Sequence, residues 1–188
     1  MIQKPTSLKG LIDTFGNPDT NKDGKVDPHW YRENIVDWKV PANWDMRIAW
    51  DTNDKVKTFK VHKLIVPVLT KTMTDVWNYA RIRAKDKYGP NQTSAFYDQK
   101  TNAELALAGM NLYGGAYNFR LKRGSENLSV HSWGCAIDFD PANNAMGDAT
   151  PKIPEWVVEI FTDNGWFWGG HWKGKRTDPM HFQYVVGY

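Results

Sequence analysis

The chain has 188 residues, of which 41% are hydrophobic and 24% are charged. These values exclude a disordered or fibrous protein, and the length is enough to bury a core, so we expect one domain over residues 1–188. The formal charge of +3 suits an acidic polymer, but no block of Lys and Arg indicates nucleic-acid binding. We expect a monomer that binds no nucleic acid.

No stretch approaches the ~20 apolar residues of a membrane span, so we expect no membrane insertion. The opening MIQKPTSLKG lacks the apolar run of a signal peptide, which predicts a cytoplasmic product. Cys135 is the single cysteine, so no internal disulfide can form. The protein would reach a substrate outside the cell only after its own release from the cell.

Residues 1–60 are predicted to form a loop-rich N-terminal part with short helices. The segment FGNPDTNKDGKVDP is dense in residues that supply turn geometry. From Asp19 to Asp27 the spacing matches the first half of a calcium loop, but Trp30 stands where a bidentate Glu is needed. A solvated turn is the favoured interpretation, and calcium binding stays open.

Residues 61–188 are predicted to form the core of the domain. The segment 61–87 has apolar residues at helical spacing, which predicts a long amphipathic helix with His62 as a surface or capping residue. A second helix is predicted over 101–115, closed by its two terminal glycines. Residues 116–124 are predicted to form a strand with a turn.

The C-terminal part is predicted to mix strands with one more helix. In GCAIDFD, residues 134–140, alternation predicts a strand with Ala136, Asp138 and Asp140 on one face. Residues 153–166 carry a helical period, and MHFQYVVGY closes the chain as a strand. The predicted fold is therefore α+β, with helices packed around a small antiparallel sheet.

A metal site is indicated by the histidines near the C-terminus. Three of the five histidines lie between residues 131 and 181, and two stand in motifs with carboxylates. In SVHSWGCAIDFD, a turn after His131 can bring its imidazole beside Asp138 on the following strand. In RTDPMHFQY, His181 supplies a third ligand. Two imidazoles and one carboxylate leave zinc an open coordination position, as a catalytic zinc site requires.

Hydrolysis at such a site needs further groups. A free carboxylate must move protons, because one bonded to zinc has lost most of its basicity, and Asp178 is the candidate base. Arg120, eleven residues before His131, is the well-placed candidate to stabilise an oxyanion, and Arg123 competes with it. A serine-hydrolase triad at Ser132 is disfavoured, since no Gly-x-Ser-x-Gly sequence is present.

Aromatic residues crowd both motifs, and GWFWGGHW could form one wall of a cleft. The candidate substrate contacts are Ser129, His171 and Trp172. About half of the nearby tryptophans are expected in the core instead. Cys135, on the strand face opposite Asp138, is expected to be buried and inert.

The sequence resembles the D-alanyl-D-alanine carboxypeptidase and L-alanyl-D-glutamate endopeptidase metallopeptidases, which share a fold with lysostaphin and the hedgehog signalling domain. SVHSWGCAID follows their Ser-x-His, six residues, Asp pattern, and DPMHFQ follows their acidic-x-x-His pattern. The resemblance implies zinc on His131, Asp138 and His181, with Asp178 as general base and Arg120 as the stabilising arginine.

The resemblance covers about residues 60–188 and implies a peptidase that cuts the stem peptides of bacterial peptidoglycan. A short single-domain chain without a signal peptide resembles the phage endolysins of this family. The alternative is a D,D-carboxypeptidase or dipeptidase of bacterial wall metabolism. A non-enzymatic zinc module is disfavoured by Asp178, because structural zinc needs no free base. The bond that is cut, the wall chemotype and a phage or host origin stay open.

Overall fold

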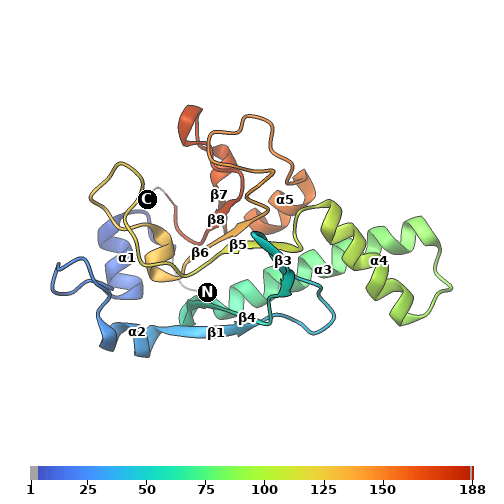
Figure 1. Ribbon diagram of the computed structural model, residues 1–188, viewed down its shortest axis with the longest axis horizontal. Coiled ribbons are helices and arrows are strands. Elements are labelled where there is room, and N and C mark those ends of the chain that lie inside the picture. The colour runs from blue at the N-terminus through green and yellow to red at the C-terminus, as the bar shows by residue number, and fades with distance from the viewer. Residues whose placement is uncertain (1–3, 187) are drawn as a thin grey trace.

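The computed structural model describes residues 4–186 and 188 (Figure 1). Its α-helices are α1 (Leu8–Phe15), α2 (Pro28–Asn34), α3 (Val66–Tyr88), α4 (Ser94–Leu107) and α5 (Glu155–Asp163). None of the helices among these residues has both the length and the apolar character needed to cross a membrane. Helices α3 and α4 form a hairpin that extends to one side of the molecule.

The strands form two sheets, which confirms the α+β class. Their bounds are β1 (Ile35–Lys39), β2 (Arg47–Ile48), β3 (Asp51–Lys55), β4 (Thr58–His62), β5 (Leu112–Gly115), β6 (Ala136–Phe139), β7 (Phe167–Trp168) and β8 (His181–Gln183). Strands β1 and β4 pair separately, and the larger sheet has the order β3-β2-β5-β6-β8-β7. Its pairings are antiparallel except between β2 and β5. The adjacent strands β6 and β8 carry two of the candidate ligands.

Helix α3 has one buried face, which includes Leu69, Met73 and Val76 and belongs to the hydrophobic core. The indole nitrogen of Trp166 donates to the Thr72 hydroxyl at 2.9 Å, which ties the segment before β7 to this helix. Both side chains are buried, so the hydrogen bond satisfies polar groups that would otherwise be costly in the core.

The predicted helix over 61–87 begins too early. Val61 and His62 belong to β4, where they pair with Val36 and Ile35, and α3 starts only at Val66, with Pro67 in its first turn. A proline is tolerated there because the first helical N–H groups have no intrahelical partner. The pairing with β1, distant in sequence, therefore overrides the local helical period.

The predicted helix over 101–115 also differs from the structure. Helix α4 ends at Leu107, and Gly109, with φ of 73°, takes the chain out of the helical conformation. Residues 112–115 form β5, which pairs with β6. The two glycines predicted to close a helix therefore lie in the central sheet, next to Asp138.

Four smaller differences concern the extent of the strands. Residues 116–124 form no strand and contribute only the bridge between Leu121 and Leu128. Strand β6 ends at Phe139, because Asp140 has φ of 46°, so Asp140 does not continue the face of Asp138. Residues 1–60 contain β1 to β3 and part of β4 as well as helices. The closing strand is limited to β8, and Gly187 lies outside the described residues.

The loop with calcium-like spacing is organised by hydrogen bonds of its own. One carboxylate oxygen of Asp27 accepts from the amides of His29 and Trp30 at 2.7 and 3.1 Å and caps α2. The other accepts from the Thr20 hydroxyl at 2.5 Å. The acidic side chains thus serve turn and cap geometry, which agrees with the solvated turn.

His62 is buried, so the prediction of a surface residue is wrong, whereas the capping role is confirmed. Its Nδ1 accepts from the Leu64 amide at 3.2 Å, and its Nε2 lies 3.1 Å from the Phe15 carbonyl oxygen. A neutral ring with hydrogen on Nε2 satisfies both contacts. Burial lowers the pKa of His62 to about 4, although the Phe15 carbonyl acts in the opposite direction.

This burial predicts a pH-dependent stability. Because the folded pKa is below the ordinary 6.5, the stabilisation is complete above pH 6.5 and is lost as the pH falls towards 4. The shift corresponds to about 3 kcal/mol. In chemical denaturation from pH 7 to 4, His62→Asn should show a shallower loss of unfolding free energy than wild type. Equal slopes would contradict the prediction.

Candidate metal centre

The three candidate ligands come from neighbouring elements. His131 lies in the 3-10 turn Val130–Trp133, where its amide donates to the Ser129 hydroxyl at 3.4 Å. Gly134 then turns the chain into β6 with φ of 66°, and a Cβ at this position would lie 2.8 Å from the backbone nitrogen of His62. Asp138 on β6 is the direct antiparallel partner of His181 on β8. The register thus places these two side chains on one face.

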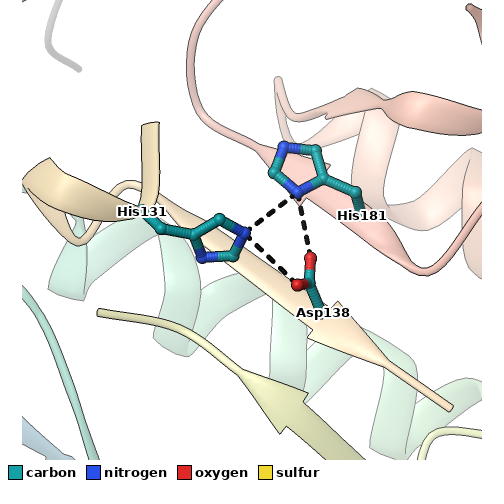
Figure 2. A group of neighbouring side chains, drawn as sticks. All are labelled: His131, Asp138 and His181. Atoms are coloured by element: carbon teal, nitrogen blue, oxygen red, sulfur yellow. Dashed lines mark hydrogen bonds and ion pairs between the residues drawn. The ribbon is translucent and has the colours of Figure 1, made fainter. Parts of the chain in front are cut away.

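The side chains of the trio converge on one point (Figure 2). His131 Nε2 lies 3.2 Å from His181 Nδ1 and 3.3 Å from one Asp138 oxygen. The other Asp138 oxygen lies 2.9 Å from His181 Nδ1. One ligand-type atom from each residue lies within 4.8 Å of the others, and among the described residues no second group of three His, Cys, Asp or Glu side chains does so.

The donor set fits a zinc ion. His131 Nδ1 lies 2.5 Å from the Ala116 carbonyl oxygen, which can only accept, so Nδ1 carries the hydrogen and Nε2 keeps its lone pair. Burial would raise the pKa of Asp138, but His131 and His181 lower it overall, so this residue is an anion. Two imidazoles and a carboxylate are the ligand types of a three-residue zinc site.

Asp178 lies beside the trio without joining it. Its amide donates to the Gly169 carbonyl at 3.0 Å, and its own carbonyl accepts from the His181 amide at 3.1 Å. A Cβ on Gly169 would lie 2.5 Å from the Asp178 carbonyl oxygen, so this close approach requires glycine. Burial raises the pKa of Asp178, while the charge of His181 opposes the rise. Its Oδ1 is buried and has no hydrogen-bond partner among the described residues.

The two candidate arginines occupy the loop before His131. The exposed Arg120 guanidinium donates to the Leu121 carbonyl at 3.3 Å, and the Arg120 backbone is held by Ser132, whose hydroxyl donates to its carbonyl at 2.9 Å. The charge of Arg123 acts to lower the pKa of Asp178, against the larger rise that burial causes. Ser132 therefore fixes the backbone of this loop by a hydrogen bond. Arg123 is the arginine whose charge affects the pKa of the candidate base, Asp178.

The candidate substrate contacts have different environments. Trp172 is partly exposed and its ring lies 5.4 Å from that of His181, tilted by 32°. His171 is exposed and contacts the Trp168 ring edge-on at 5.2 Å. Ser129 is buried and caps the turn that carries His131. Cys135 is fully buried, as expected, and burial raises its pKa well above the ordinary value.

Two residues near the site were not found from the sequence. Asn144 is fully buried; its Oδ1 accepts from the amides of Lys152 and Ile153 at 2.8 and 3.0 Å, and its carbonyl accepts from the Met180 amide, next to His181. The sequence around Asn144 has no hydrophobic periodicity that would identify a buried residue in a loop. Gln183 contacts His181 at 3.0 Å, and its i+2 position on β8 could have indicated that they share a face.

The site combines a largely buried group of three potential metal ligands with a separate carboxylate beside it. A family model described as D-alanyl-D-alanine carboxypeptidase matches residues 123–184, less than half of the chain. The matched segment contains the trio and Asp178 but not Arg120. No curated protein and no solved structure matches the chain significantly. The match supports a peptidase of the metal-dependent kind at a general level.

Proposed function

We propose that the chain is a zinc-dependent peptidase that hydrolyses amide bonds in peptidoglycan stem peptides. The observation that carries the proposal is the convergence of His131, Asp138 and His181 inside the segment that the family model matches. Zinc bound there supplies a Lewis acid that polarises a carbonyl group and acidifies water.

The roles of the remaining residues follow from their environment. Asp178 has a buried oxygen without a hydrogen-bond partner among the described residues, and burial raises its pKa. Both features support its role as the group that takes a proton from water and delivers it to the leaving amine. Arg120 or Arg123 supplies positive charge for the developing oxyanion. The effect of Arg123 on Asp178 supports the second of these.

The substrate is held beside the trio by the aromatic side chains of Phe167 and Trp172. The ring of Trp172 stacks on Phe167 with centroids 5.8 Å apart and keeps part of its surface exposed. A flat, partly exposed ring suits an extended peptide or the adjoining sugar. His171 is a further proposed substrate contact. Ser129 contributes by capping the turn that carries His131.

Within this class we propose an L-alanyl-D-glutamate endopeptidase of the phage endolysin kind, bacteriolytic when it reaches the wall. The description of the matching family model favours a second candidate, a D-alanyl-D-alanine carboxypeptidase. The two differ in the bond that is cut, so purified muropeptides with complete stem peptides distinguish them.

The test is mass spectrometry of such muropeptides after incubation with the zinc-loaded protein. Stem peptides split between L-alanine and D-glutamate are expected for the endopeptidase, and free D-alanine would indicate the carboxypeptidase. If no amide bond is cut by protein that binds zinc, the peptidase proposal fails and a non-enzymatic zinc module takes its place.

A further inference from the structure

We infer that Gln183 is a positioning residue that determines which nitrogen of His181 faces the metal. This inference rests on the proposed function, because it assumes that the trio binds zinc. Gln183 follows His181 by two residues on β8 and is 1% exposed. Its Oε1 lies 3.0 Å from His181 Nε2, on the side of the ring away from Asp138.

The orientation of the Gln183 amide follows from its other contacts. Its Nε2 donates to the carbonyl oxygens of Val185 at 3.0 Å and Tyr188 at 3.1 Å. Both carbonyls can only accept, so the amide nitrogen must face them and the amide oxygen must face His181. An amide oxygen cannot donate, and therefore His181 Nε2 carries the hydrogen.

The consequence for His181 is a single ring orientation. With hydrogen on Nε2, Nδ1 is the nitrogen left to bind a metal ion, and it lies 2.9 Å from Asp138 and 3.2 Å from His131. Rotating the ring by 180° would place carbon atoms against Asp138 and Gln183 and break both contacts. Gln183 thus selects Nδ1 as the ligand atom.

The two histidines of the trio are oriented by different means. His131 donates through Nδ1 to the backbone carbonyl of Ala116, which no substitution removes, and it presents Nε2. His181 presents Nδ1 and depends on a side chain for its orientation. Partners of this kind typically contribute 10- to 100-fold in metal affinity. Gln183 is therefore the point at which the orientation of one ligand can be changed by substitution.

The experiment compares zinc dissociation constants, measured by competition with a chromogenic chelator, for wild type and for Gln183→Met. This substitution keeps the length of the side chain and removes the amide oxygen and nitrogen. We expect zinc affinity to fall about 10- to 100-fold. The matched control is Gln99→Met, at an exposed position of α4, which should bind zinc as wild type does.

A second variant separates positioning from folding. Gln183→Glu keeps an oxygen facing His181 but turns its other oxygen towards the Val185 and Tyr188 carbonyls. We expect its melting temperature to fall while its zinc affinity stays within a few-fold of wild type. A residue with a merely structural role would lower both properties in both variants, which would overturn the inference.

Long-range ¹H–¹⁵N NMR spectra of wild type give a readout independent of any variant. In the zinc-loaded protein His181 should be protonated at Nε2 and bonded to zinc through Nδ1, and in the zinc-free protein Nε2 should still carry its hydrogen. Coordination through Nε2, or an unchanged affinity of Gln183→Met, would overturn the inference alone. Wild type that binds no zinc would instead contradict the proposed function, and the zinc-free spectrum would still test the Gln183 contact.

Discussion

Replacing Asp178 with Asn is expected to lower kcat/KM for stem-peptide hydrolysis by roughly a hundredfold to ten-thousandfold, the range for loss of a general base. The amide has the shape of the carboxylate but cannot take a proton from water. Asp178 lies outside the ligand trio, so the variant should bind zinc with wild-type stoichiometry. Kinetics on purified muropeptides, together with metal analysis of the same preparation, measure both properties.

The same substitution is expected to leave the stability of the zinc-free protein unchanged or to raise it. Burial raises the pKa of Asp178, so its ionised form is disfavoured in the folded, zinc-free protein, and its Oδ1 has no hydrogen-bond partner among the described residues. A neutral amide removes that cost, and the zinc-free variant should melt at the same or a higher temperature than zinc-free wild type. The control is Asp163→Asn at the exposed end of α5, which should change neither property. Full activity of Asp178→Asn would remove this residue from the mechanism.

The grouping of two of the candidate metal ligands could be predicted because their information is local. His131 and Asp138 are joined by one turn, and the positive φ that this turn needs is provided by Gly134, which is visible in the sequence. The strand around Asp138 shows the alternation of polar and apolar residues. What the sequence does not contain is the register that makes Asp138 the partner of His181, since it depends on two strands more than forty positions apart.

The errors lie where distant pairing decides local structure. Val61 and His62 continue a helical pattern in the sequence but pair with β1, and the glycines at 114 and 115 look like a helix end but lie in β5. Strand pairing satisfies the backbone groups of these residues and overrides propensity. Asn144 was missed for a related reason, because its hydrogen-bond partners are backbone groups that only the folded chain brings to it.

Removing the metal should abolish activity and destabilise the fold. The trio gathers a carboxylate and ring nitrogens in a buried space. Burial acts to lower the pKa of His181, but its hydrogen bond to Asp138 and the charge of Asp138 raise it overall. If free zinc is a thousandfold above its dissociation constant, binding stabilises the fold by about 4 kcal/mol. Chelation should therefore lower the melting temperature and stop hydrolysis, and added zinc should restore both.

A ligand variant locates this effect in the trio. His131→Ala removes one of three ligands and should lose both zinc binding and hydrolysis, because two ligands do not complete a zinc site. His29→Ala is the matched control, since His29 is exposed on α2 and lies 3.5 Å from Glu33. It should keep wild-type activity, zinc stoichiometry and response to chelation.

Because binding requires ligands free of protons, zinc affinity should also weaken as the pH falls. Undiminished hydrolysis by protein shown to be metal-free, or by His131→Ala, would contradict a zinc-dependent reaction at this site.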